Sequence, residues 1–146
     1  MDHIDLRILE LLKANSRIKF SEIKDEIQLS LPAISERIKK LEEHGIIDQY
    51  TVKVNRRKMG YNMLSFILVN IQEKEAIDEF RKLVNERDNI LECYHLAGEY
   101  DYIIKIATKD NDELAEFITQ TMKALPGHVK TNSVIVLSTV KEKVNI

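Results

Sequence analysis

The residues that could carry chemistry in this chain are few, and they do not gather into a catalytic set. Its four histidines, His3, His44, His95 and His128, stand far apart without a His-x-x-x-His spacing, and its single cysteine, Cys93, has no Cys-x-x-Cys partner. Common metal sites need ligands at such short spacings. The chain has only four glycines and no glycine-rich phosphate loop. We therefore predict a protein that is not an enzyme and that has neither a metal ion nor a cofactor.

A second set of polar residues lies in the stretch 29–47, which has the pattern of a helix. Ser30 can cap its N-terminus, and Pro32 falls in the first turn, where a missing N–H group costs nothing. Gly45 supplies the left-handed position that ends the helix. The apolar residues recur at the helical period and form one face, Ile34, Ile38 and Leu41. The other faces, which carry hydroxyl and charged groups, are left to solvent or to a partner.

A shorter helical pattern comes just before this stretch. Ser21 is placed to cap it, and Ile23 and Ile27 recur at i and i+4. Only Gln28 and Leu29 separate the two helices. Helices joined this closely form a helix-turn-helix, in which the second helix enters the DNA major groove and its N-terminal residues reach base edges. The spacing alone equally allows an αα-hairpin that only packs.

A third helix is predicted near the N-terminus, over residues 2–14, with Asp2 as its cap. Its apolar positions keep the helical period: Ile4, Ile8, Leu9 and Leu12. After Gly45 the period changes, and the alternating apolar residues of the stretch 47–54 predict one extended strand, which is either a wing or a linker. The basic run 55–58 follows, and for it a solvated turn is favoured over a clamp on the DNA backbone.

From residue 61 on, strand and helix patterns alternate in the order βαββαβ. The predicted strands are 63–71, 90–97, 101–108 and 134–140, and the predicted helices are 76–84 and 111–125. This order is the ferredoxin-like arrangement, with both helices on one face of a four-stranded antiparallel sheet. Because the strands are apolar on both sides, the bare face needs a cover. A second copy of the chain, packed sheet against sheet, is the economical cover.

Charge divides the chain in the same place as these patterns. Residues 1–60 carry 12 lysines and arginines against 10 acidic residues, whereas residues 61–146 carry 10 against 14. The basic excess is modest, so DNA binding would need two or more copies acting together. No apolar run approaches the roughly 18 residues of a membrane span, no signal peptide pattern is present, and a lone cysteine does not suit an oxidising compartment. We therefore expect a cytoplasmic protein without membrane association.

The ordered set of these residues resembles the Lrp/AsnC family of transcription regulators. The matching residues are Asp2, Asp5, Ile8, Leu9, Leu12, Ser16, Arg17, Ile18, Leu29, Ser30, Ile34, Arg37, Ile38, Leu41, Glu42, Gly45, Ile46, Ile47, Tyr50, Gly98, Glu99, Tyr100, Asp101, Tyr102, Leu125, Pro126 and Gly127. They cover nearly the whole chain. The resemblance implies an α+β protein with a three-helix helix-turn-helix domain and linker strand over residues 1–60. It also implies a ferredoxin-like domain over residues 61–146 for effector binding and for assembly of dimers into tetramers or octamers.

Two groups of site residues follow from the resemblance. The expected DNA-binding residues are Ser30, Pro32, Ala33, Ser35, Glu36, Arg37, Lys39 and Lys40, with Arg37 and Lys40 as phosphate contacts. In the family a free amino acid binds in a cleft between dimers, and the residues expected to line it are Gly98, Glu99, Tyr100 and Asp101, with Thr131, Asn132 and Ser133 nearby. Glu99 or Asp101 would hold the ammonium group. Composition alone explains the same loop as a tight turn, in which Gly98 allows positive φ and Asp101 bonds nearby backbone.

Two residues depart from the family pattern. Gln28 stands where many members have glycine, so a non-glycine residue must take a left-handed conformation there. Leu31 stands where a small or polar residue is common, near the DNA-facing start of the second helix. Both bear on base preference and leave the motif intact.

The expected function is a homo-oligomeric, DNA-binding transcription regulator that responds to an amino acid. One alternative is an architectural protein that wraps or bridges DNA without an effector. The other is an enzyme that uses the ferredoxin-like domain, with the helical head serving only for packing.

Overall fold

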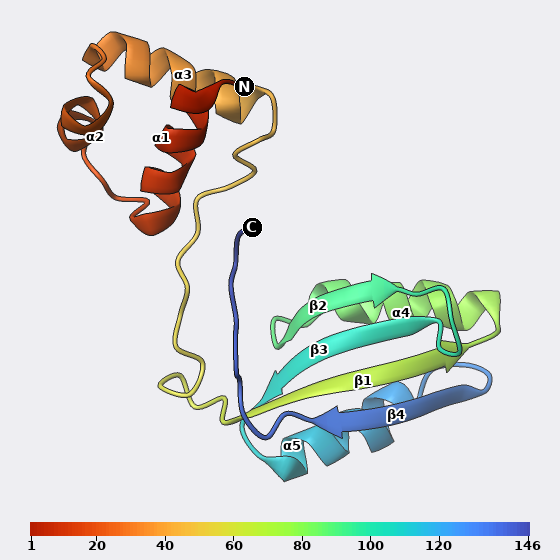
Figure 1. Ribbon diagram of the computed structural model, residues 1–146. Coiled ribbons are helices and arrows are strands. Elements are labelled where there is room, and N and C mark those ends of the chain that lie inside the picture. Colours follow the sequence, from red (N-terminus) through yellow and green to blue (C-terminus); the bar gives the residue numbers. More distant parts are fainter. The chain divides into compact units, whose positions relative to one another are not determined.

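The computed structural model describes all residues, 1–146, and the chain divides into two compact units (Figure 1). One unit comprises Met1–Lys53 with Lys143–Ile146, and the other comprises Val54–Glu142. We call the first the head and the second the sheet unit.

The head is built from three helices, α1 (His3–Ala14), α2 (Phe20–Ile27) and α3 (Leu31–Glu43). Each contributes its apolar face to one core of fully or almost fully buried side chains: Ile8, Ile23, Ile34, Ile38 and Leu41. The predicted three-helix arrangement is therefore confirmed, since every helix has a buried stripe at the helical period.

The helix ends show which of the predicted caps form. Asp2 caps α1, and Ser30 caps α3 by accepting a 3.4 Å hydrogen bond from the backbone N–H of Ala33. The predicted cap Ser21 is wrong. Helix α2 begins at Phe20, so Ser21 already lies within the helix. The cap residue is Lys19, which makes no side-chain cap hydrogen bond.

Two left-handed residues border α3. Gly45 has φ of +66° just after its end, and the backbone N–H of Ile46 donates to the carbonyl of Leu41 at 2.9 Å, which is the six-to-one bond of a Schellman motif. Gln28 has φ 55° and ψ 38° in the link before α3, and it is the only non-glycine residue with positive φ. The strained turn predicted at this position is therefore present.

The predicted strand over 47–54 does not form within the chain. Residues 48–55 have no strand assignment, and Val52 is 82% exposed. The reason is the lack of a neighbour, because an extended segment becomes a strand only when another segment pairs with its backbone. The stretch 56–60 is a turn, in which the side-chain oxygen of Asn55 accepts a hydrogen bond from the backbone N–H of Lys58 at 3.2 Å.

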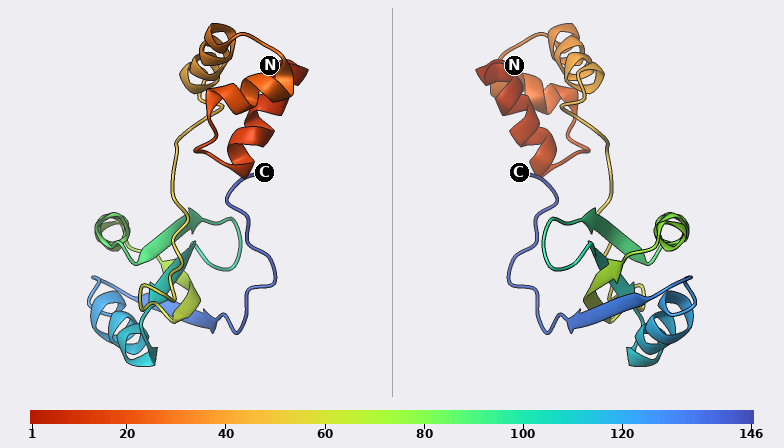
Figure 2. Two further views of the ribbon diagram at one scale, coloured as in Figure 1. Left: turned by 90° about the vertical axis from the view of Figure 1, so that its left-hand side faces the viewer. Right: turned by 90° about the vertical axis from the view of Figure 1, so that its right-hand side faces the viewer.

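The sheet unit has the predicted order of elements. Its members are β1 (Met63–Ile71), α4 (Lys74–Glu86), β2 (Ile90–His95), β3 (Tyr102–Thr108), α5 (Asn111–Glu116), which continues as a π-helix over Phe117–Met122, and β4 (Val129–Ile135). The strands are antiparallel and lie in the order β2-β3-β1-β4. Figure 2 shows α4 and α5 on the same face of the sheet. The α+β class and the ferredoxin-like arrangement are confirmed.

The last strand lies earlier in the chain than the range 134–140 that we predicted. It pairs with β1 from Val129 opposite Ile71 to Ile135 opposite Ser65. The prediction was wrong because it relied on the apolar run 134–140. Most of this run lies beyond the residues of β4 that pair with β1, and Leu137 in it is 93% exposed. A strand at the edge of the sheet tolerates the polar residues 130–133 because much of it faces solvent.

The core of the sheet unit lies between the sheet and its two helices. The strands contribute Ile67, Val69, Ile71, Tyr102, Ile104 and Ile106, and the helices contribute Ala76, Phe80, Leu114, Phe117, Met122 and Leu125. Side chains alternate between the two faces of a strand. The intervening residues of β1 and β3 therefore point to the face that carries no helix, which we call the open face.

None of the helices has both the length and the apolar character that a membrane crossing requires.

Candidate functional site

The outer surface of α3 carries a stripe of exposed polar side chains. Because α-helical neighbours recur three and four residues apart, one side of the helix presents Pro32, Ser35, Glu36, Lys39 and Lys40, all of them exposed. We call these five residues the α3 stripe. Ala33 is half-buried, and the hydroxyl of Ser30 is occupied by its cap hydrogen bond. The stripe is held on a helix whose two ends are fixed by Ser30 and Gly45.

Two ion pairs lie along the stripe, each joining residues one helical turn apart. Lys40 Nζ lies 2.8 Å from Glu36 Oε1, and Lys39 Nζ lies 3.5 Å from Glu43 Oε1. The hydrogen bond between Glu36 and Lys40 lowers the pKa of the carboxyl and raises the pKa of the ammonium group. All four side chains are well exposed, so these pairs contribute little to stability and can be exchanged for other partners. The lysines are therefore available to a phosphate group.

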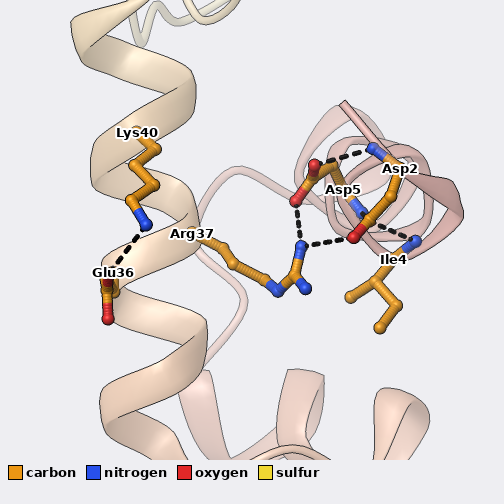
Figure 3. Close-up of polar contacts among 6 residues, drawn as sticks. All are labelled: Asp2, Ile4, Asp5, Glu36, Arg37 and Lys40. Atoms are coloured by element: carbon orange, nitrogen blue, oxygen red, sulfur yellow. Dashed lines mark hydrogen bonds and ion pairs between the residues drawn. The ribbon is translucent and has the colours of Figure 1, made fainter.

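Arg37 does not lie with the stripe. Its Nη1 donates hydrogen bonds to Asp2 Oδ2 at 2.9 Å and to Asp5 Oδ1 at 2.7 Å, so the guanidinium group faces the first turn of α1 (Figure 3). The two predicted phosphate contacts therefore differ in their partners, since Arg37 bonds Asp2 and Asp5 of α1, whereas Lys40 pairs with Glu36 of its own helix. The signal available in the sequence is the pair of acidic residues at the start of α1, of which the capping pattern accounts only for Asp2.

The loop between β2 and β3 is fastened to β1 by Asp101. Its carboxylate accepts a 2.8 Å hydrogen bond from the backbone N–H of Ile71, and its own N–H donates to the carbonyl of Val69 at 3.0 Å. The backbone N–H of Leu96 in turn donates to the Asp101 carbonyl at 2.8 Å. This carboxylate is therefore engaged in holding the loop, as the purely structural interpretation of the loop expects.

The other predicted acidic residue of the loop is free. Glu99 is exposed and makes no hydrogen bond or ion pair. Gly98 is not in the left-handed region that we had allowed for, and a Cβ atom added to it would meet nothing within 4 Å. The backbone at Gly98 therefore has no need of glycine, and the missing side chain leaves open space beside Glu99.

The register of β4 separates the three polar residues predicted to lie near this loop. Thr131 and Ser133 pair with Val69 and Ile67, which belong to the helix-covered face. Asn132 lies between them and therefore points to the open face, where its Nδ2 lies 3.4 Å from the hydroxyl of Tyr100. The structure joins Asn132 to the loop and places Thr131 and Ser133 on the other face. The alternation of side chains along a strand would have distinguished the two groups.

The open face of the sheet is apolar at its centre and charged at one side. Paired rows across the strands place Phe66, Leu68, Tyr94, Ile103 and Val134 together on this face. Beside them Lys105 makes a 2.9 Å ion pair with Glu92. Tyr94 is 56% exposed and Val134 is 49% exposed, so no part of the chain covers this face fully.

Comparisons with known proteins match the head and the sheet unit to two different family models. Two family models match, the winged helix-turn-helix DNA-binding model over residues 1–48 and the Lrp/AsnC ligand binding domain over residues 64–146. The HTH-type transcriptional regulator FL11 of Pyrococcus abyssi is 37% identical over 142 residues, which cover 97% of this chain and 93% of that protein. The HTH-type transcriptional regulator LrpC of Bacillus subtilis is 34% identical over 121 residues, 83% of each chain.

Solved structures share the fold over the full length. A transcriptional regulator from Neisseria meningitidis, solved as a complex with L-Met, superposes with a TM-score of 0.94 at 28% identity, covering 100% of this chain and 96% of that one. The structure of LrpC from Bacillus subtilis gives a TM-score of 0.88 at 31% identity, covering 98% and 99% of the two chains. These relatives are transcription regulators and not enzymes. The chain belongs to the Lrp/AsnC family of DNA-binding transcription regulators.

Proposed function

We propose that the head, with the linker up to residue 60, binds double-stranded DNA by placing α3 in the major groove. The observation that carries this proposal is the α3 stripe, which is polar, exposed and fixed on a capped helix. Recognition helices of this class contact base edges with residues near their N-terminus. The proposed base contacts are Ser35 and Glu36, with Ser30, Pro32 and Ala33 lining the approach to the groove.

Within this surface the two lysines and the two central polar residues have different roles. Lys39 and Lys40 contact phosphates, which gives affinity without sequence preference. The hydroxyl of Ser35 can donate to or accept from a base edge, and the carboxylate of Glu36 accepts from the amino group of cytosine or rejects sites that lack it.

Two substitutions separate these roles. Lys40→Ala should weaken binding to all duplexes equally and reduce the slope of log affinity against log salt by about one for each DNA-bound subunit. Ser35→Ala should instead change the preference between duplexes. Lys82→Ala is the matched control, because Lys82 forms a similar exposed pair with Glu86 on α4. Affinities would be measured by fluorescence anisotropy on random-library duplexes, and equal losses on every duplex for both head variants would contradict the assignment.

We also propose that a free amino acid binds at the loop 98–101 and acts as an effector. Support comes from Glu99, whose carboxylate has no partner within the chain, and from the open space beside Gly98. Glu99 would hold the ammonium group, and backbone N–H groups of the loop would hold the carboxylate. Asp101 keeps the loop in place, Tyr100 and Asn132 border the site, and Thr131 and Ser133 would contribute only from the far side of β4. The L-Met complex of the neisserial relative supports an amino acid as the ligand class.

A screen of the twenty common amino acids tests this second proposal. A ligand that binds the folded state raises the melting temperature by mass action. Glu99→Gln should abolish the shift caused by any amino acid that gives one. Glu79→Gln, which removes an equally exposed and unpaired carboxylate on α4, should leave it unchanged. If no amino acid changes the melting temperature, the DNA affinity or the assembly, the architectural alternative without an effector is favoured.

The oligomer is proposed to form through the open face, by pairing two sheets in a dimer that assembles further into tetramers or octamers. An apolar band of this kind needs a cover, and a two-fold dimer buries the same patch on both copies. Leu68→Lys should reduce the mass seen by light scattering, because it places a charge at the centre of the band. Leu137→Lys is the control, since Leu137 is 93% exposed beyond the end of β4. Unchanged mass for Leu68→Lys would contradict this interface. We also propose that the protein acts in the cytoplasm, where bacterial and archaeal DNA is found.

A further inference from the structure

Arg37 is the one basic residue of α3 that is turned away from the α3 stripe. Its side chain is 30% exposed, whereas those of Lys39 and Lys40 are 72% and 61% exposed. A residue that approaches DNA phosphates needs a reachable and uncompensated charge. The charge of Arg37 is already balanced by two carboxylates within hydrogen-bond distance.

The two carboxylates that hold Arg37 are themselves fixed to α1. Asp2 Oδ1 accepts 2.9 Å hydrogen bonds from the backbone N–H groups of Ile4 and Asp5, and Asp5 Oδ2 accepts one from the backbone N–H of Asp2 at 2.9 Å. This is a capping box built from two aspartates. Each carboxylate uses one oxygen to close the helix end and offers the other to Arg37, as Figure 3 shows. Both carboxylates are therefore held in place by the backbone of α1 before they bind Arg37.

The contacts between α1 and α3 explain why such a network matters. The helices meet through aliphatic side chains, chiefly Ile8, Ile34 and Ile38, and apolar contact is non-directional. Apolar contact alone is therefore less selective for the angle of α3 than a directional contact is. Charge-assisted hydrogen bonds are short and directional, so they can select one orientation from several that pack almost equally well.

We propose that Arg37 is a positioning residue that fixes the orientation of α3 against α1 and thereby sets base preference. It does so through its bonds to Asp2 and Asp5, without contacting phosphate. The inference rests on the proposed role of the α3 stripe. It assigns Asp2 and Asp5 a part in DNA recognition although neither touches the stripe.

Asp5→Asn gives opposite results under the two possible roles of Arg37. If Arg37 contacts phosphate, loss of the Asp5 charge frees it and removes a negative charge from the head, so binding to every duplex strengthens. If Arg37 positions α3, the same change loosens the helix, and binding to a preferred duplex weakens by about tenfold, the scale of one lost base contact. The probes are a duplex enriched from a random library by the wild-type protein and a scrambled duplex of the same composition.

Arg37→Gln and Arg37→Lys complete the test. We expect Arg37→Gln to weaken binding to the enriched duplex at least as much as Asp5→Asn does, because it removes the contacts to both carboxylates. Binding to the scrambled duplex should change little, and the salt slope should stay unchanged. Combining Arg37→Gln with Asp5→Asn should add nothing further, because Arg37→Gln already removes the contact between Arg37 and Asp5. Arg37→Lys should behave like Arg37→Gln, because the lysine side chain is one bond shorter and its Nζ would not reach both carboxylates. If Arg37 instead contacts phosphate, Arg37→Lys should retain that contact. Asp48→Asn controls for the loss of one acidic group from the head.

The outcomes separate this inference from the proposed function. Failure of the wild-type protein to enrich any duplex would count against DNA binding by the head and would remove the basis of the inference. Enrichment by the wild type, followed by stronger binding of Asp5→Asn or a salt slope lowered by about one per subunit in Arg37→Gln, would overturn the positioning role alone. Helix content by circular dichroism confirms that each variant is folded.

Discussion

Gln28 offers a direct test of how strain in the helix-turn-helix link limits the stability of the head. It has φ 55° and ψ 38°, its side chain is exposed, and it makes no hydrogen bond through that side chain. The left-handed region costs a residue with a Cβ atom roughly 1–2 kcal/mol. Glycine avoids this cost but loses about 0.5–1 kcal/mol more backbone entropy on folding. The centres of these two ranges differ by about 0.75 kcal/mol, so Gln28→Gly should stabilise the head by about 0.5–1 kcal/mol.

Native-state amide hydrogen exchange can measure this gain in the full chain. A stabilisation of about 0.5–1 kcal/mol slows exchange through opening of the head by roughly two- to fivefold. Peptides from α2 and α3 should show the change, and peptides from β1 and β3 serve as the internal reference. The assay does not require the oligomer to dissociate, because it reports local opening.

Two further substitutions at the same position decide whether strain is the cause. Gln28→Ala retains the Cβ atom and should give no gain. Gln28→Asn should give a partial gain, since asparagine tolerates the left-handed region better than most residues. Equal protection in Gln28→Gly and the wild type, or the same gain in Gln28→Ala, would refute the reasoning.

Two other predictions concern acid stability and a close contact in the sheet unit. The pKa values of Asp2 and Asp5 lie below the ordinary value of 3.8, chiefly because each carboxyl accepts the other residue's backbone N–H. When folding lowers the pKa of a carboxyl group, the resulting stability is fully present at pH values above the pKa of that group in the unfolded chain. It is lost as the pH falls through the pKa of the group in the folded protein. We would therefore measure the melting temperatures of the wild type and of Asp5→Asn from about pH 6 to about pH 3. Below pH 3.8 the melting temperature of the wild type should fall more steeply than that of Asp5→Asn, and parallel curves would contradict this. Gly127 has φ +74°, a conformation that costs a residue with a Cβ atom roughly 1–2 kcal/mol, so Gly127→Ala should destabilise the sheet unit by about that amount. The added Cβ atom would also meet the carboxylate of Glu73, but this flexible, exposed side chain can move aside, so adding Glu73→Ala should recover little of the loss in urea midpoints.

Much of the fold could be predicted from local patterns, because the determining interactions are local. The cap at Ser30 and the left-handed positions at Gln28 and Gly45 each depend on a few neighbouring residues. The order of strands and helices in the sheet unit follows from hydrophobic period, which reflects burial of one face of each element. These features were therefore visible without knowledge of the tertiary structure.

The errors occur where a residue's role depends on a distant partner. The stretch 47–54 has the composition of a strand but finds no backbone partner within the chain, and the start of β4 is decided by its pairing with β1. A distant partner also decides where Arg37 points, since its guanidinium group bonds Asp2 and Asp5, about 35 residues away. Its role as a phosphate contact stays a prediction. The sequence identified the element on which Arg37 lies and not the direction in which it points.

The contacts of Tyr100 connect two of the proposed activities of the sheet unit. Its hydroxyl lies against Asn132, and Asn132 points to the open face, where Leu68 and Ile103 share its row. An amino acid held at Glu99 would therefore contact the short loop that carries Tyr100. A second copy packed on the open face would contact Asn132, on the edge strand beside that loop. If both proposals hold, a ligand that changes the contact between Tyr100 and Asn132 should change the free energy of assembly. Linkage then requires that assembly change ligand affinity by the same factor. Light scattering across amino acid concentrations and ligand titrations across protein concentrations should give one coupling factor, and a factor of one in both would show that the loop and the open face act independently.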